Sequence, residues 1–131
     1  MKSDAIRNLT PAMNMQDVRE MERMQAELCA EYGAVFTPSN STVNSGIALQ
    51  TLGLFPFHGL RHPTTPDTTG WYLWCGEEFS QDPKFFQPVH TGHVYQNCPE
   101  IRRLLGLAPG YRFLLAADYL DVWFDQSLLR I

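Results

Sequence analysis

An unbroken apolar segment between two glycines limits what this chain of 131 residues can fold into. The segment, Trp71-Tyr72-Leu73-Trp74-Cys75, lies between Gly70 and Gly76. Its residue types favour a strand, and because apolar side chains do not alternate with polar ones, both faces of that strand are expected to be covered. Trp71 and Trp74 are three residues apart, so on a strand they point to opposite faces. The sequence therefore predicts a central strand with both tryptophans buried.

A helical repeat precedes this strand. From Gln16 to Tyr32, apolar side chains recur at steps of three and four residues and form one stripe. Either Asn14 or Asp17 can cap the first turn with a side-chain oxygen. Gly33 is suited to end the helix, because glycine adopts the left-handed conformation at little cost. The stripe consists of Val18, Met21, Met24 (or Gln25), Leu28 and Tyr32.

Shorter patterns predict the remaining elements. A short helix is expected at about Val43–Thr51, after a polar loop over residues 37–45. Leu54–Leu60 has strand composition, but Pro56 favours an edge or a bulge of the sheet, since proline cannot donate to the ladder. Residues 61–70 are expected to form a turn-rich linker, and residues 77–88 an acidic, aromatic loop. Two more helices are expected, at about Thr91–Gln96 and Pro99–Leu105, and two more strands, at Arg112–Ala116 and Val122–Phe124.

These elements together indicate one α+β domain. We expect a mixed or antiparallel sheet of about four strands packed against two or three helices, with the Gln16–Tyr32 helix among them. The length of the chain suits a single domain. Residues 1–14 lack clear periodicity and are expected to form a flexible N-terminal arm, so the domain is predicted over residues 15–131.

Composition and charge argue against several classes of protein. The net charge is −4, and an acidic surface repels phosphate backbones, so a nucleic-acid partner is not expected. No stretch approaches the ~18 apolar residues of a membrane span, and residues 1–7 lack the apolar region of a secretory signal. Cys29, Cys75 and Cys98 are odd in number and lack C-x-x-C spacing, which favours reduced, buried thiols. A cytoplasmic location without a membrane partner is therefore predicted.

The histidines and cysteines do not form a recognised metal or nucleophile pattern. His90 and His93 fall on one face of a helix, but their spacing to Cys98 fits no common zinc module. A Cys–His nucleophile would use Cys75 or Cys98 with one of these histidines. Cys75 lies in an apolar strand, where a thiol is inert. We therefore expect neither a metal site nor a catalytic cysteine.

Two adjacent carboxylates, Glu77 and Glu78, are the remaining candidates for acid–base chemistry. Neighbouring residues of an extended segment point to opposite faces, so the pair is poorly placed to act on one substrate. No nucleotide-binding or hydrolase motif is present in the sequence, so we predict no catalytic residue and no cofactor. The alternative reading is a small hydrolase-like or ligand-binding domain that uses His90 and His93 together with Glu77 and Glu78.

The acidic, aromatic loop is the strongest candidate for a partner-binding surface. Large aromatic side chains anchor protein interfaces, and carboxylates steer towards basic partners. Exposed phenylalanines in a loop are unfavourable unless a partner covers them. The alternative is that the phenylalanines at the end of the loop close the core. The predicted contact residues are Glu77, Glu78, Phe79, Asp82, Phe85 and Phe86.

The stretch from Gly70 to Glu78 resembles the Gly-Trp, strand, Gly-x-Glu signature of a bacterial polymorphic-toxin immunity family, formerly a domain of unknown function. The resemblance extends over residues 54–124 or so. The sequence departs from the family at Asp67, which lies three rather than two residues before Gly70, and at Arg61-His62, where the family often has Arg-Glu. The similar downstream pattern comprises Asp82-Pro83, Cys98-Pro99-Glu100-Ile101, Leu105, Pro109-Gly110 and Arg112-Phe113.

This resemblance implies a cytoplasmic immunity protein, or antitoxin. Such a protein binds a cognate toxin domain through a stoichiometric interface and blocks its active site or a docking surface. The family has no established catalytic residues, so the resemblance assigns none to this chain. It implies a protein partner rather than a substrate, and it implies no particular oligomeric state.

Overall fold

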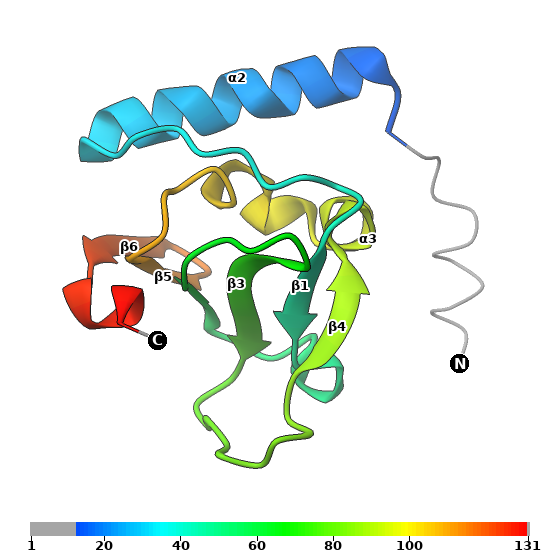
Figure 1. The fold of residues 1–131 in the computed structure, drawn as a ribbon, viewed down its shortest axis with the longest axis vertical. Coiled ribbons are helices and arrows are strands. Elements are labelled where there is room, and N and C mark those ends of the chain that lie inside the picture. Colours follow the sequence, from blue (N-terminus) through cyan, green and yellow to red (C-terminus); the bar gives the residue numbers. More distant parts are fainter. Residues whose placement is uncertain (1–12, 131) are drawn as a thin grey trace.

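The computed structural model describes residues 13–130, so most of the predicted N-terminal arm lies outside the described residues. One mixed sheet of six strands is present in the described chain, and helices cover one of its faces (Figure 1). The predicted α+β class is confirmed, but the predicted number of strands, about four, is too low. The elements are α2 Met15–Tyr32, β1 Asn44–Ile47, η1 Leu49–Thr51, β2 Phe57–Arg61, β3 Thr68–Cys75, β4 Gln87–His90, α3 Thr91–Asn97, η2 Pro99–Leu104, β5 Tyr111–Ala116, β6 Tyr119–Phe124 and η3 Gln126–Leu129.

The long helix α2 matches the prediction closely. Asn14 caps it in a reciprocal arrangement, because the Asp17 backbone N–H donates to the Asn14 side chain at 2.8 Å and the Asn14 N–H donates to the Asp17 carboxylate at 3.1 Å. Gly33 ends the helix with a φ of 70°, as expected of a left-handed cap. The buried stripe of α2 packs on the sheet side, where the Gln25 side-chain amide also donates to the Arg102 carbonyl at 2.9 Å.

Strand β3 lies in the interior of the sheet, as its sequence predicts. The strand order is β4-β1-β3-β2-β5-β6, in which β1 and β3 are parallel and the other neighbours are antiparallel. Trp71 is fully buried among the side chains under the helices, while Trp74 is 5% exposed and belongs to a separate cluster. The prediction that the two tryptophans are buried on opposite faces of a central strand is confirmed.

The prediction of a short helix at Val43–Thr51 is wrong. Residues 44–47 form β1, and only residues 49–51 form a helical turn, η1. The pairing of β1 with β3 and β4 overrides the local preference of these residues. The hydroxyl of Ser45 reinforces this pairing, because it lies 2.7 Å from the hydroxyls of both Thr69 and Thr91 and is fully buried.

Two further expectations about the strands need correction. Leu54–Leu60 was predicted at an edge or a bulge, whereas β2 begins at Phe57 and lies between β3 and β5. Pro56 precedes the strand, so its missing N–H falls outside the ladder. The predicted 77–88 loop ends earlier than expected, since Gln87–His90 forms the edge strand β4. Pro88 is tolerated there because an edge strand has one unpaired side.

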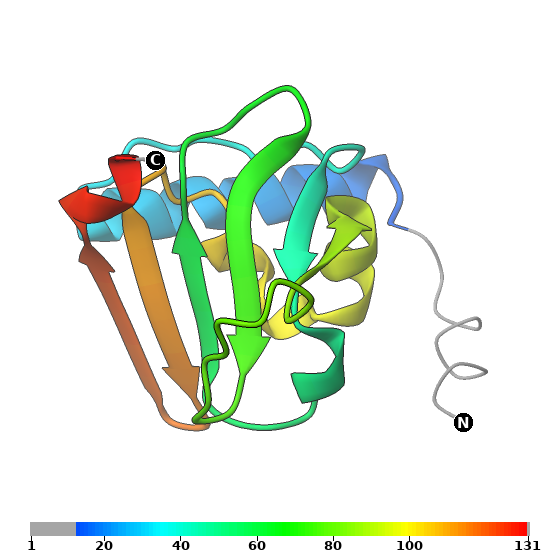
Figure 2. The ribbon, with the colours of Figure 1, turned by 60° about the horizontal axis from the view of Figure 1, so that its bottom comes forward.

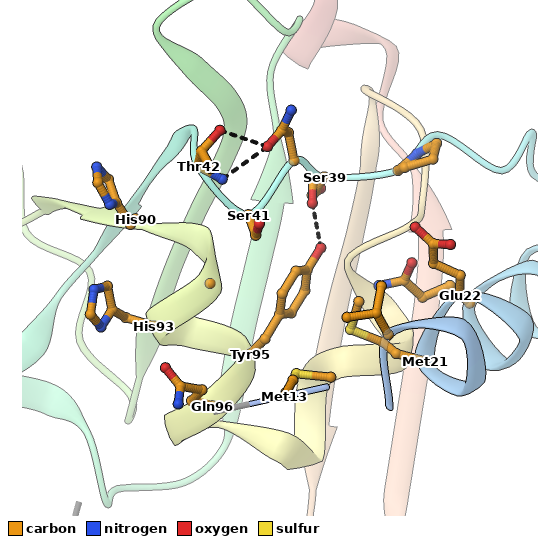
Figure 3. Close-up of a pocket in the computed structure, with 15 residues that line it drawn as sticks. Met13, Met21, Glu22, Ser39, Ser41, Thr42, His90, His93, Tyr95 and Gln96 are labelled. Atoms are coloured by element: carbon orange, nitrogen blue, oxygen red, sulfur yellow. Dashed lines mark hydrogen bonds between the residues drawn. The ribbon is translucent and has the colours of Figure 1, made fainter. Parts of the chain in front are cut away.

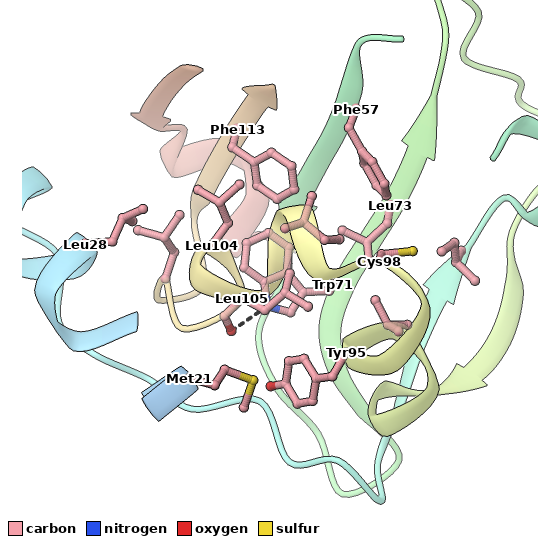
Figure 4. Close-up of a cluster of buried hydrophobic side chains, with 14 of the residues drawn as sticks. Met21, Leu28, Phe57, Trp71, Leu73, Tyr95, Cys98, Leu104, Leu105 and Phe113 are labelled. Carbon is pink, nitrogen blue, oxygen red and sulfur yellow. Dashed lines mark hydrogen bonds between the residues drawn. The ribbon is translucent and has the colours of Figure 1, made fainter. Parts of the chain in front are cut away.

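The two faces of the sheet are covered differently. The main core lies between the sheet and the helices, where Trp71, Phe113, Leu104 and Leu105 pack together (Figure 4). A smaller cluster lies on the other face, and the chain after β3 folds back across that face (Figure 2). This second cluster consists of Ala48, Leu60, Trp74, Phe85 and Leu128, with Tyr72 and Phe86 packed against it.

Within residues 13–130, no helix has the length and apolar character needed to cross a membrane.

Candidate partner-binding surface

Three connections meet at the end of the sheet where β3 ends and β2 begins. The β2–β3 register places Phe57 opposite Cys75, and the β2–β5 register places the same Phe57 opposite Leu115. The segment before β2, the loop after β3 and the turn between β5 and β6 therefore lie side by side, as Figure 2 shows along the lower margin of the sheet. Residues that are far apart in the sequence therefore lie close together at this end of the sheet.

Exposed carboxylates gather here. Glu77, Glu78 and Asp82 are exposed in the loop after β3, and Asp118 is exposed in the turn between β5 and β6. Lys84 is the basic residue of these connections. We call this region the acidic end, defined by its exposed residues Leu54, Phe55, Glu77, Glu78, Phe79, Asp82, Asp118 and Tyr119.

The three phenylalanines of the loop differ in how far they are exposed to solvent. Phe79 is 51% exposed, and its ring lies 5.1 Å from the ring of Trp74. Phe85 is only 8% exposed and Phe86 is half-buried, and their rings pack edge to face 4.9 Å apart beneath Phe79. Phe79 is thus the ring exposed to solvent, while Phe85 and Phe86 support it and close the smaller core.

Hydrogen bonds hold the loop in this shape. The Asp82 carboxylate accepts from the Lys84 N–H at 2.9 Å, and the Asp82 carbonyl accepts from the Phe85 N–H at 2.9 Å. Gln87 links the loop to η1, because its side-chain oxygen accepts from the Leu49 N–H at 3.1 Å. The exposed acid and the exposed ring are therefore presented on an ordered scaffold, which reduces the entropy lost on binding.

Three exposed apolar residues of the acidic end were not among the predicted contact residues. Leu54, Phe55 and Tyr119 are 56%, 62% and 56% exposed. Leu54 lies against Gly76, where a Cβ would come within 3.1 Å of the leucine side chain and where φ is +92°. The available signal was the position of the Leu54–Phe55 pair between two turn formers, Gly53 and Pro56, which favours a loop rather than the predicted strand.

The histidines considered as ligands lie at the opposite end of the sheet. Asn44 of β1 pairs with both His90 and Thr68, so His90 is level with the start of β3, whereas Glu77 follows its end. The alternative site, which needed His90 and His93 together with Glu77 and Glu78, is therefore not assembled. Among the described residues, no group of three or more His, Cys, Asp or Glu side chains is placed to hold a metal ion.

His90 and His93 instead line a cavity of about 710 Å³ between the start of α2, the 38–42 loop and α3 (Figure 3). Their rings are exposed and stack with centroids 6.1 Å apart. Tyr95 points into this region, and its hydroxyl donates to the Ser39 carbonyl at 2.6 Å. The cavity wall thus combines apolar side chains of α2 with satisfied polar groups.

The three cysteines are buried, and none forms a disulfide. Burial raises the pKa of Cys75 to about 11, and burial also raises the pKa of Cys29. The Cys75 thiol is therefore protonated at neutral pH, the opposite of what a nucleophile requires. Thr51 fixes the backbone at this position, since its hydroxyl accepts from the Cys75 N–H at 2.9 Å.

A family model for the Imm33-like domain matches residues 24–125. The chain belongs to the Imm33-like family. The resemblance to an immunity-protein family found in the sequence is thereby confirmed. No curated protein and no solved structure matches the chain.

The Imm33-like match spans the second half of α2, the whole sheet and the loop after β3. The acidic end therefore lies within the family domain and is not an appendage to it. Immunity-protein families are in general not enzymatic.

Proposed function

We propose that this Imm33-like protein is a cytoplasmic immunity protein that neutralises a cognate bacterial toxin domain by binding it stoichiometrically through the acidic end. The observation that carries the proposal is one surface on which the exposed Phe79 ring, the exposed Leu54–Phe55 pair and four carboxylates lie together. Residues 15–131 act as one binding unit in this proposal. Family membership supports the expectation of a toxin partner, and the exposed rings and carboxylates support the choice of the acidic end as its binding surface.

The composition of the acidic end suits a basic protein partner. Carboxylates at the margin of an interface raise the association rate, and the effect weakens as salt screens them. Phe79 and Phe55 offer large apolar contacts that water solvates poorly. Toxin domains that act on nucleic acids or nucleotides need basic sites, so an acidic surface is the matching complement.

Neutralisation in this scheme requires no chemistry from the immunity protein. A partner that covers the active site of the toxin, or a surface through which the toxin reaches its target, abolishes activity by exclusion. The ordered loop presents Phe79 on the ring of Trp74, which itself is held in the smaller core. Such a preformed surface binds with little rearrangement.

The charge contribution is tested with the triple variant Glu77→Gln, Glu78→Gln and Asp82→Asn, measured against a toxin domain identified among the genes that flank this one. Asparagine keeps the side-chain oxygen that accepts from the Lys84 N–H, so the loop is expected to retain its shape. We expect association about tenfold slower at low salt and little difference at high salt. Equal association rates at every ionic strength would place the interface elsewhere.

A matched triple variant controls for the loss of charge alone. Glu22→Gln, Glu31→Gln and Asp67→Asn removes three exposed carboxylates that lie away from the acidic end. We expect this variant to bind the toxin domain with nearly the rate of the unmodified protein. An equal slowing in both triple variants would mean that net charge, not the acidic end, guides association.

The aromatic contribution is tested with Phe79→Ala. Because the ring is half-exposed, we expect the free energy of unfolding to fall by only about 1–2 kcal/mol. As an interface anchor the same ring is expected to contribute about 2 kcal/mol to binding, which corresponds to roughly 30-fold faster dissociation. Val35→Ala, a change at a more exposed apolar residue outside the acidic end, serves as the control. Full binding by Phe79→Ala would refute the anchor.

A further inference from the structure

The two edges of the sheet differ in how they are protected. At one edge, β4 is four residues long and contains Pro88, both of which discourage strand addition. At the other edge, β6 is six residues long and contains neither proline nor lysine. Figure 2 shows β6 as the outermost strand with no element beside it. Within residues 13–130 this edge is therefore open along its length.

The register of the last hairpin shows which backbone groups face outwards. The Asp125 N–H donates to the carbonyl of Gly110, the residue directly opposite, at 2.7 Å. In an antiparallel pair such bonded positions alternate with unbonded ones. The backbone groups of Tyr119, Asp121 and Trp123 therefore face β5. Those of Leu120, Val122 and Phe124 face the open edge, where no described residue bonds them.

The side chains beside this edge select the kind of strand that fits it. Asp121 is exposed between two exposed aromatic rings, Tyr119 and Trp123, which share its face of the strand. Arg112 pairs with Asp125 at 3.1 Å and stacks over Trp123, so it does not neutralise Asp121. An incoming strand with a basic residue opposite Asp121 gains a cross-strand ion pair.

A second copy of the chain fits less well. Antiparallel pairing of two β6 strands about their centre would bring the Asp121 carboxylates of both copies close together, and like charges across a ladder are unfavourable. The acidic end also begins at Tyr119 and Asp118, so the open edge continues the surface already proposed for the toxin. Both observations favour a basic segment of the toxin over self-association.

We propose that an extended, basic segment of the toxin adds to β6 as a seventh strand, next to the contacts at the acidic end. This inference rests on the proposed function and specifies its geometry. Main-chain hydrogen bonds to Leu120, Val122 and Phe124 would supply affinity, and pairing with Asp121 would supply selectivity for a basic partner.

Amide hydrogen exchange tests this geometry directly. The isotope-labelled immunity protein is measured by NMR alone and in complex with a toxin domain identified among the genes that flank this one. We expect exchange at Leu120, Val122 and Phe124 to slow at least about tenfold on binding, because these N–H groups gain acceptors. Tyr119, Asp121 and Trp123 are expected to exchange slowly in both states. Exchange in β4 is expected to stay unchanged.

A charge reversal provides a second, independent readout. Asp121→Lys is expected to weaken toxin binding at least about tenfold, while Asp67→Lys, an equal reversal at an exposed position at the opposite end of the sheet, is expected to leave it nearly unchanged. Circular dichroism confirms that both variants fold before binding is measured. Equal affinities for Asp121→Lys and Asp67→Lys would refute the selectivity for a basic strand.

The outcomes separate this inference from the function on which it rests. Tight binding without new protection at Leu120, Val122 and Phe124 would refute strand addition and leave the immunity function standing. Absence of any binding would refute the immunity function and the inference together. The same alternating protection in the chain alone, with a doubled mass in solution, would identify a second copy as the occupant and overturn the proposal.

Discussion

Arg61 provides the most demanding test of the packing described above. Its side chain is fully buried, and no carboxylate of the described residues pairs with it. The guanidinium instead donates to three backbone carbonyls, those of Thr69 at 2.9 Å, Thr37 at 2.8 Å and Leu107 at 2.7 Å. It also lies 5.6 Å from the centre of the Trp71 ring. One side chain thus connects the start of β3 with two separate loops.

The charge of Arg61 persists despite this burial. Burial lowers the pKa of the guanidinium to about 10, which is still well above neutral pH. A buried charge is unfavourable by several kcal/mol, and here the three carbonyl dipoles and the indole ring offset that cost. The substitution Arg61→Met removes both the unfavourable buried charge and the favourable contacts with the carbonyls and the indole ring. The resulting change in the free energy of unfolding therefore shows which of the two is larger.

The expected effect follows from the individual contacts. A hydrogen bond from a charged donor contributes about 1.5–3 kcal/mol, so the loss of three is at least about 4.5 kcal/mol. Relief of the buried charge reduces the loss, and we expect Arg61→Met to lower the free energy of unfolding by about 3 kcal/mol. Arg61→Lys is expected to rescue little, because one ammonium group cannot reach three carbonyls arranged around a planar fork.

Equilibrium denaturation in urea, followed by tryptophan fluorescence, measures this change. Arg19→Met, at an exposed position on α2, is the control and is expected to change the free energy of unfolding by less than about 0.5 kcal/mol. If Arg61→Met were as stable as the unmodified protein, or more stable, the three carbonyl bonds would contribute no more than the buried charge costs. That result would refute the role assigned to Arg61.

Four other predictions concern the core, the candidate ligands and Cys75. Trp74→Ala is expected to lower the free energy of unfolding by about 3–5 kcal/mol, measured by urea denaturation, because it empties the centre of the smaller core. Elemental analysis of protein purified without added metal is expected to find no stoichiometric zinc, since His90 and His93 have no third ligand near them among residues 13–130. About one zinc per chain, lost with the fold on chelation, would contradict this. Iodoacetamide at pH 8 is expected to modify Cys75 slowly in the folded protein and rapidly in urea. The pKa of about 11 also means that the contribution of Cys75 to stability is complete below pH 9 and declines between pH 9 and about 11, because the unfolded thiol ionises first.

The parts of the fold that the sequence predicted correctly are those encoded locally. Helix α2 has a full apolar stripe, a cap at Asn14 and a stop at Gly33, so its position requires no knowledge of its neighbours. Strand β3 carries an unbroken apolar run, and the burial of Trp71 and Trp74 on opposite faces follows from its period.

The parts that the sequence predicted wrongly depend on distant partners. Strand β1 reads Asn44-Ser45-Gly46-Ile47, which has almost no strand propensity, and it forms because β3 and β4 lie on either side of it. Strand β4 contains Pro88, which is tolerated because β4 is an edge strand. In the candidate surface, the exposure of Phe79 was predictable from its position in a loop. The placement of Tyr119 at the acidic end depends on the β2–β3, β2–β5 and β5–β6 strand registers, which no local sequence pattern encodes.

The position of Trp74 explains how a small domain can combine a stable core with an exposed aromatic contact. Trp74 is held on a central strand, stacked on His58 with ring centroids 4.8 Å apart and packed within the smaller core. Phe79 rests on this fixed ring, with Phe85 and Phe86 beneath it, so its orientation is set by the core before any partner arrives. Because a partner then need not order a mobile side chain, the contact area of Phe79 is available for affinity. Under the proposed function, the exposed carboxylates of the loop can therefore be changed without displacing the rings that keep the surface in place.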